Sequence, residues 1–282
     1  MGFEFFLLFF ILGTFIGSFL NVLIDRIPQE QSVVFGRSYC DSCKHKLSWI
    51  DLIPIVSFIM LNGKCRYCRK KISIYYPIVE TTTGTLFVIV SYAILSNAFM
   101  MWATDIPYIV ATIYFLSIIA SLITIFFIDL KYGIIPFIIV FFAVGMTFLW
   151  YLFLPFSHFS PQDTNFYAIQ ISDLFRYILS GIGSFAAFFL LFYATKGKGL
   201  GFGDVVYAFL MGLLLGFPRI LLGLYIAFLT GAFISLILVL LKKKKLRGGT
   251  IPFGPFLVFG TVISIIWGQQ IIGQMMYYLM AG

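Results

Sequence analysis

The chain has 282 residues, of which 61% are hydrophobic and only 11% are charged, and its mean hydropathy is +1.03. This composition leaves too little polar surface for a soluble globular protein, so it excludes the soluble classes and predicts an integral membrane protein. The formal net charge of +8 favours attraction to anionic lipid and a fixed orientation in the bilayer over nucleic-acid binding.

Eight apolar segments are predicted to cross the membrane, which makes the expected fold all-α and polytopic with about eight transmembrane helices. Their apolar runs are continuous and lack the alternation of a membrane barrel, so helices are the expected spans. The sixth segment is the shortest, and most of the others have about 20 residues, enough to cross about 30 Å of hydrocarbon. In chain order the segments cover residues 3–24, 75–96, 106–128, 134–155, 174–194, 203–218, 220–241 and 255–280.

The distribution of the cations predicts the orientation of these spans. Only Arg176 and Arg219 among the 19 lysines and arginines fall on one side of the membrane. The other side holds the segment 25–74 and a basic run at residues 242–247. The positive-inside rule makes this basic side cytoplasmic, with both chain ends outside.

The polar segment 25–74 between the first two spans contains all four cysteines of the chain. They form two Cys-x2-Cys pairs, Cys40 with Cys43 and Cys65 with Cys68. Four thiolates can surround a zinc ion tetrahedrally and leave it no open coordination position, which is the arrangement of a structural site. Because the cytosol is reducing, disulfides are the weaker alternative. We therefore expect a zinc-binding loop, with unliganded and reversibly oxidised thiols as the remaining interpretation.

Three acidic residues, Glu80, Asp129 and Asp204, lie in or at the ends of predicted spans, where a carboxylate is costly and marks a candidate functional site. The third span runs inward and ends at Asp129, whereas the sixth runs outward and begins at Asp204. Both carboxyl groups should therefore lie at the cytoplasmic face. If the two helices are neighbours, one carboxyl group keeps a proton while the other is ionised, and such a pair can activate water against a peptide carbonyl.

The stretch GLGFGD places glycines directly before Asp204. Gly201 and Gly203 carry no side chains, so the backbone can turn freely and an extended substrate can approach closely. We therefore interpret them as substrate-access glycines. The simpler alternative is that they pack helices together or end one of them.

Six stretches, in the same order along nearly the whole chain, resemble the type IV prepilin peptidases, a GxGD class of membrane aspartyl proteases. The resemblance assigns the two catalytic positions to Asp129 and Asp204 and includes Glu80 as a possible supporting residue. Two positions depart from the pattern: Val206 and Phe137 replace polar residues found in many relatives, and both carboxylates remain. The six stretches are GTFIGSFLNVLIDRIP, the two Cys pairs flanking LIP, ISIYYPIVE, IDLKYGIIP, GLGFGD and IPFGPFLVFG.

The resemblance implies an endopeptidase of the bacterial inner membrane that removes the basic leader of prepilins and pseudopilins on the cytoplasmic face. It also implies N-methylation of the new N-terminal residue, with S-adenosylmethionine as methyl donor. The expected partners are these precursor proteins and the lipid bilayer, without nucleic acid.

The expected domains are a first transmembrane helix at 1–24, a four-cysteine loop associated with methylation at 25–74, and a transmembrane aspartyl peptidase domain at 75–282. The alternative function is an ion or proton-coupled transporter in which Asp129 and Asp204 form a cation path.

Overall fold

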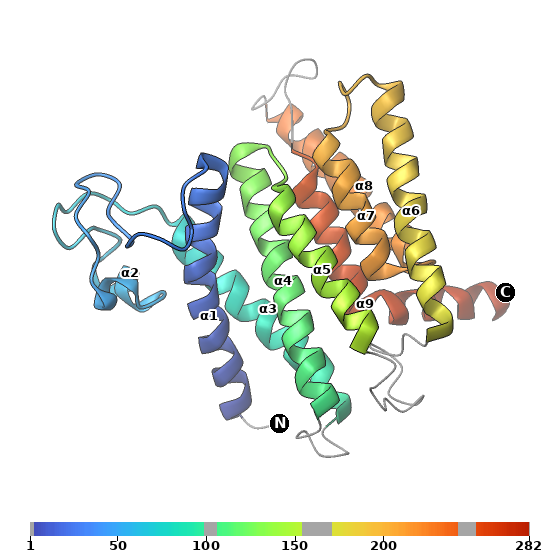
Figure 1. Ribbon diagram of the computed structural model, residues 1–282, viewed down its shortest axis with the longest axis horizontal. Helices are drawn as coiled ribbons and strands as arrows, with labels where there is room; N and C mark the ends of the chain where they lie inside the picture. Colours follow the sequence, from blue (N-terminus) through green and yellow to red (C-terminus); the bar gives the residue numbers. More distant parts are fainter. Residues whose placement is uncertain (1–2, 99–105, 154–170, 242–251, 282) are drawn as a thin grey trace. The chain divides into compact units, whose positions relative to one another are not determined.

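The computed structural model describes residues 3–98, 106–153, 171–241 and 252–281. Within these ranges all the named elements are helices, as Figure 1 shows. The chain divides into two compact units, Met1–Phe99 and Met100–Gly282. The expected all-α class is therefore confirmed, while the predicted functional division at residues 24 and 74 stays a prediction.

The first unit is built on a close pair of helices, α1 (Phe3–Arg26) and α3 (Tyr75–Ala98). Small residues let the two backbones approach, since a side chain added at Gly13 or Gly17 would meet the α3 backbone at Gly84 or Glu80. The segment between these helices contains the short helices η1 (Ile27–Gln29), η2 (Trp49–Leu52) and α2 (Val56–Met60).

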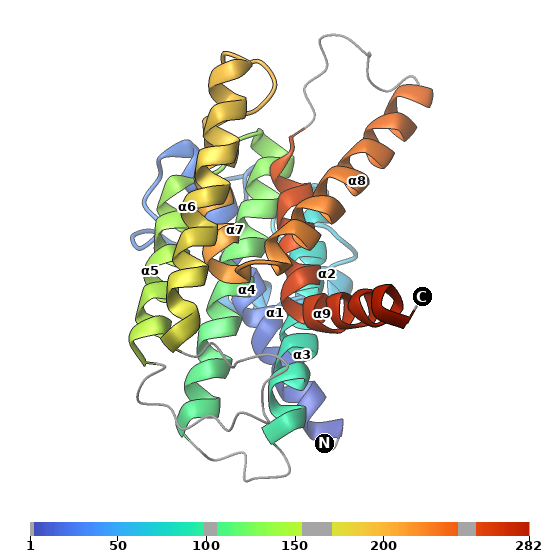
Figure 2. The same ribbon diagram turned by 90° about the vertical axis from the view of Figure 1, so that its right-hand side faces the viewer.

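The second unit is a bundle in which α7 lies between α6 and α9 (Figure 2). Helix α6 packs on α7, α8 packs on α9, and α4 contacts both α5 and α9. The six helices are α4 (Ile106–Tyr132), α5 (Phe137–Phe153), α6 (Ile171–Ala194), α7 (Phe202–Leu215), α8 (Arg219–Leu240) and α9 (Gly254–Ala281).

Each of the eight predicted spans coincides with a helix, but only six helices of the described residues are long and apolar enough to cross a membrane. Helices α5 and α7 have 17 and 14 residues, which corresponds to about 26 and 21 Å of the roughly 30 Å of hydrocarbon. The protein is therefore a multi-pass membrane protein, and the expected count of eight spans is not established.

Backbone chemistry explains why these two helices are shorter than predicted. The segment expected at 134–155 begins only at Phe137, because the preceding Pro136 starts the helix. Its residues 154–155 lie outside the described ranges. The segment expected at 203–218 ends at Leu215, because Gly216 has a positive φ of 63° and Pro218 follows it.

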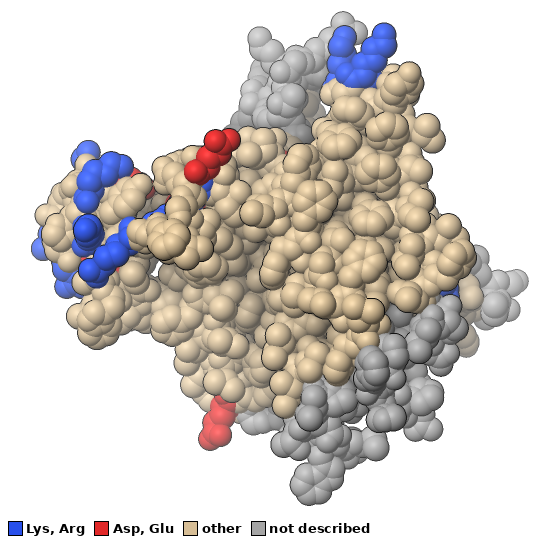
Figure 3. Space-filling model, in the orientation of Figure 1, with Lys and Arg blue, Asp and Glu red and all other residues tan. Residues whose placement is uncertain are grey.

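Lysines and arginines gather on the loop between α1 and α3 and beyond the end of α6 on the face that Figure 3 shows, whereas the helical surface there is almost free of charge. This separation is the one expected for a protein whose helices contact lipid and whose connecting segments contact water. The basic run at 242–247 lies outside the described residues.

Candidate active site and cysteine cluster

Asp129 lies in the last turn of α4 and is 4% exposed. The first residue of α9, Gly254, packs directly against its carboxyl group: a Cβ atom added there would be 2.5 Å from Oδ2. The backbone amide of Gly254 is directed at this carboxyl group. The positive end of the α9 dipole therefore faces Asp129 and offsets part of the cost of its burial.

Asp204 occupies the first turn of α7 and is 8% exposed. Its Oδ2 atom accepts a hydrogen bond of 3.0 Å from the backbone N–H of Gly201, the residue that caps the helix. This is half of a capping box, in which an acidic side chain reaches back to the helix start. Helix α7 thus fixes the carboxyl group and stabilises its negative charge at the same time.

Ile135, in the turn after α4, packs between the segments that carry the two aspartates. It contacts Gly203, where an added Cβ would be 2.9 Å from the Ile135 Cβ, and also Gly254. The turn forms because Gly133 adopts a positive φ of 70° and donates its N–H to the Asp129 carbonyl. The starts of α7 and α9 and the end of α4 therefore meet at one place.

The two carboxyl groups are close enough to interact electrostatically. Oδ2 of Asp129 is buried and has no hydrogen-bond partner among the described residues. A buried acceptor without a partner is uncommon in folded proteins and calls for a proton, a water molecule or a ligand beside it. The structure thus brings together the pair that the sequence placed at one membrane depth.

The two glycines before Asp204 differ in their surroundings. Gly201 is exposed, and the nearest atom to an added side chain would be Oδ2 of Asp204 at 3.3 Å. Gly203 is required for packing, because Ile135 occupies the space where its side chain would be. A role of either residue in substrate access stays a prediction.

The four cysteines form one cluster whose sulfur atoms all lie within 4.8 Å of one another. The two pairs have the same backbone geometry: Lys44 N–H donates to Cys40 O, and Arg69 N–H donates to Cys65 O. Lys44 and Arg69 also share a positive φ, 56° and 58°. Two equivalent turns therefore present the four thiols to a common centre.

This donor set fits a structural metal ion. Zinc with four thiolates at about 2.3 Å has sulfur atoms about 3.8 Å apart, and the Sγ atoms of Cys40 and Cys68 are 3.9 Å apart. Burial acts to raise the pKa of the Cys40 thiol, but backbone N–H donors at Cys43 and Ser42, together with the thiols of Cys65 and Cys43, outweigh it and lower the pKa from 9.0 to about 7. A thiol with this pKa is readily deprotonated for metal binding.

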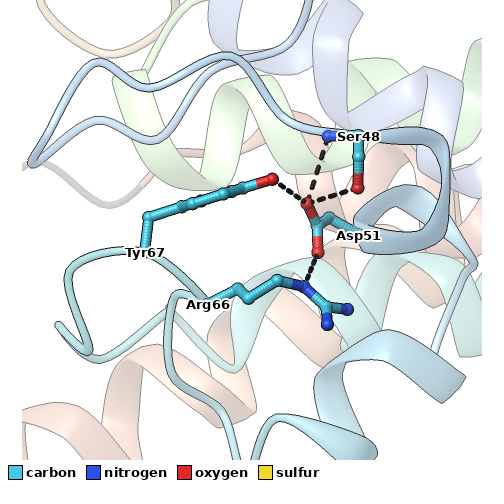
Figure 4. Close-up of polar contacts among 4 residues, drawn as sticks. All are labelled: Ser48, Asp51, Arg66 and Tyr67. Carbon is cyan, nitrogen blue, oxygen red and sulfur yellow. Dashed lines mark hydrogen bonds and ion pairs between the residues drawn. The ribbon is translucent and has the colours of Figure 1, made fainter.

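Asp51 connects the two halves of the cysteine loop, as Figure 4 shows. Its carboxylate accepts hydrogen bonds from Ser48 N–H at 3.1 Å and Ser48 Oγ at 2.7 Å on its own segment. It also accepts hydrogen bonds from Arg66 Nε at 2.7 Å and Tyr67 Oη at 3.2 Å, between the second pair of cysteines. Burial acts to raise the pKa of Asp51, but the bonds from Arg66 and Ser48 outweigh it and lower the pKa below 3.8.

Glu80 belongs to the first unit and is 7% exposed in the second turn of α3. Its Oε2 atom accepts a hydrogen bond of 2.8 Å from the backbone N–H of Ile55 in the cysteine loop. It therefore contacts the segment between the two cysteine pairs.

Three contributors to these sites were not predicted from the sequence: Asp51, Ile135 and Gly254. The spacing of Ser48 and Asp51 is that of a capping box, so this signal was available. Ile135 and Gly254 lie in the stretches IDLKYGIIP and IPFGPFLVFG, but their individual roles come from contacts between segments far apart in the chain.

Comparison with known proteins agrees with this architecture. Residues 11–94 match the bacterial peptidase A24 N-terminal domain, and residues 116–236 match the type IV leader peptidase family. No solved structure matches the chain.

Several relatives match over most of their length and are named prepilin leader peptidase/N-methyltransferase. The protein of Legionella pneumophila is 28% identical over 97% of this chain and 96% of the relative. That of Aeromonas hydrophila is 27% identical over 95% and 92%, and that of Pseudomonas aeruginosa is 26% identical over 93% and 90%. The chain therefore belongs to the type IV leader peptidase family and begins with the N-terminal domain of its bacterial peptidases.

Proposed function

We propose that this protein is a membrane-embedded aspartyl endopeptidase that removes the leader of type IV prepilins and pseudopilins and N-methylates the new N-terminal residue. The observation that supports the peptidase activity is the burial of two electrostatically interacting carboxyl groups, Asp129 and Asp204, at helix ends that pack against one another. The names of the relatives support the substrate class and the methylation.

The proposed hydrolysis uses the two carboxyl groups as one unit. One is ionised and takes a proton from a water molecule, whose oxygen attacks the carbonyl carbon of the scissile peptide bond. The other is protonated and gives its proton to the carbonyl oxygen. The C–N bond then breaks as the nitrogen receives the proton that the first carboxyl group took from water, and the water oxygen remains in the new carboxyl group of the leader. The partnerless Oδ2 of Asp129 is the position we assign to the attacking water or the shared proton.

The charge distribution supports a cytoplasmic site in the bacterial inner membrane. A prepilin carries a basic leader followed by a hydrophobic segment, so its scissile bond is held near the membrane surface. The positive-inside rule puts the loop 25–74 and the turns next to both aspartates on the cytoplasmic side. The leader is then cut on the side where it remains after the hydrophobic segment enters the bilayer.

We assign methylation to the cysteine loop and zinc to its four thiolates. Zinc in this site is structural, because four thiolates leave no open position for a reactant. S-adenosylmethionine supplies the methyl group that the amine receives, and the loop contributes an ordered scaffold next to the membrane. The alternative function, an ion or proton-coupled transporter, has no support from the relatives, which carry the names of a peptidase and methyltransferase.

The test is cleavage and methylation of a purified prepilin by the full-length enzyme in membranes, followed by mass spectrometry of the product. We expect Asp129→Asn and Asp204→Asn each to abolish cleavage, with a loss of about 1,000-fold or more, because neither variant retains both acid and base. Each variant should still methylate a product that wild-type enzyme has already cleaved. Cleavage at the wild-type rate by either variant would rule out the aspartyl mechanism.

A further inference from the structure

Glu80 joins three segments of the first unit. It extends from α3, its Oε2 atom accepts the Ile55 N–H at 2.8 Å, and it also accepts a hydrogen bond from the hydroxyl of Ser18 on α1. Both donors are neutral groups. A carboxylate that costs free energy to bury is thus used here to hold a backbone amide of the cysteine loop.

The residue that Glu80 holds has an unusual backbone conformation. Ile55 has φ 60° and ψ −50°, and the N–H of Val56 bonds to the carbonyl of Pro54 around it. This geometry is close to the classic γ-turn, which is rare and strained, and a β-branched side chain fits it poorly. Such strain persists only where surrounding contacts enforce it, and it concentrates at functional sites.

The position of this turn makes it an attachment point for the whole loop. Ile55 caps the start of α2, between Cys43 and Cys65, and the preceding Pro54 is buried. Asp51, four residues earlier, is bonded to Arg66 and Tyr67 within the second cysteine pair. A restraint on Ile55 can therefore act through a short, cross-linked segment on the cysteine cluster.

We propose that Glu80 is a positioning residue that latches the cysteine loop to the α1–α3 pair, and that methyl transfer needs this latch whereas leader cleavage does not. The inference rests on the proposed function for its assignment of methylation to the loop. Glu80 acts as a hydrogen-bond acceptor for a strained turn. The latch therefore requires an acceptor oxygen at this position and no proton transfer by Glu80.

The experiment compares four variants of the full-length enzyme in membranes: Glu80→Leu, Glu80→Gln, the double variant Glu80→Leu/Ile55→Gly, and Glu30→Gln as a control. Glu30 is an exposed acidic residue of the same loop. Three properties are measured for each, namely leader cleavage, methylation of a pre-cleaved product, and hydrogen exchange of the peptide that contains Ile55.

Glu80→Leu removes the acceptor, so we expect exchange at Ile55 to rise and methylation to fall about tenfold, with cleavage within about twofold of wild type. Glu80→Gln keeps an amide oxygen as acceptor, and its exchange and methylation should remain within about threefold of wild type. The added Ile55→Gly substitution should restore part of the methylation lost in Glu80→Leu, because glycine adopts a positive φ without the latch. Glu30→Gln should resemble wild type in all three properties.

Several results would overturn the latch. If Glu80→Gln lost methylation as completely as Glu80→Leu, the charge or proton of Glu80 would be needed instead. Equal losses of cleavage and methylation in Glu80→Leu would make Glu80 a general folding residue, and unchanged exchange at Ile55 would remove the contact itself. A wild-type enzyme that cleaves but does not methylate would contradict the proposed function, and the exchange measurement would still decide the latch.

Discussion

Asp129 shows how a single residue depends on the absence of another side chain. Its Oδ2 atom faces Gly254, whose missing Cβ leaves space for the carboxyl group at the start of α9. Gly254 lies two residues after Pro252 and directly before Pro255. Pro255 suits the first turn of a helix, because it lacks an N–H that would stay unpaired there. The sequence PFGP thus starts a helix and leaves space for a carboxyl group beside it.

Gly254→Ala should therefore disable cleavage without unfolding the protein. The added methyl group would be 2.5 Å from Oδ2 and would push the carboxyl group out of position. A displacement of about 1 Å costs roughly 100-fold in rate, so we expect a loss of this size in leader cleavage, with unchanged expression.

The matched control is Gly145→Ala in α5, where an added Cβ meets nothing within 4 Å. Its cleavage rate should equal that of the wild type, as measured on the same prepilin. Wild-type activity in Gly254→Ala would show that this glycine does not set the position of Asp129.

Among the elements, the α6–α7 pair is one whose backbones pack closely, with little space for an added side chain. Gly212 of α7 lies against the α6 backbone, where an added Cβ would be 2.5 Å from the carbonyl oxygen of Ser180 and 2.6 Å from the Cα of Gly181. Ser184 of α6 also donates its hydroxyl to the carbonyl of Ala208 on α7 at 2.7 Å. Small residues and an interhelical hydrogen bond are the usual means of helix association in membranes.

Gly212→Ala should loosen this pair and, with it, the helix that carries Asp204. Overpacking of a tight contact costs about 1–3 kcal/mol. We expect Gly212→Ala to inactivate in detergent at a lower temperature than the wild type. At low temperature, its loss of activity should be smaller than its loss near the inactivation temperature. Gly183→Ala in α6 is the control, since its added Cβ meets nothing within 4 Å, and it should inactivate at the wild-type temperature. Equal inactivation temperatures for Gly212→Ala and the wild type would contradict this account of the interface.

At the scale of the whole molecule, the two candidate sites lie in different compact units. The cysteine cluster and Glu80 belong to Met1–Phe99, and both aspartates belong to Met100–Gly282. Each unit has its own helix packing and its own polar site. We therefore expect the two proposed activities to be separable by changes confined to one unit.

Metal removal tests this separation. Treatment with a zinc chelator, or the substitution Cys65→Ser, should release the metal and disorder the loop, because a structural zinc contributes directly to folding. Methylation of a pre-cleaved product should then fall at least about tenfold, whereas leader cleavage by the carboxyl pair should change little. Metal content is measured on the same samples, and restored methylation after zinc addition is the control. Parallel loss of both activities would show that the units do not work independently.

The sequence by itself determined the class of the protein, the approximate helices and the residues with unusual chemistry. Apolar runs fix helices because backbone polar groups in lipid must be bonded within one segment. The four cysteines were identified by local spacing, and the aspartates stood out because carboxylates are costly near hydrocarbon. These signals depend only on residues close together in the chain.

Only the tertiary structure decided how these parts meet. The contact of Ile135 with Gly203 and Gly254 joins the ends of three helices, and no local pattern encodes a contact between residues so far apart in the chain. The bond from Ile55 to Glu80 likewise depends on the folding of the loop back onto α3. Such contacts arise from the packing of whole helices, whose close approach is set by the shapes of both surfaces together.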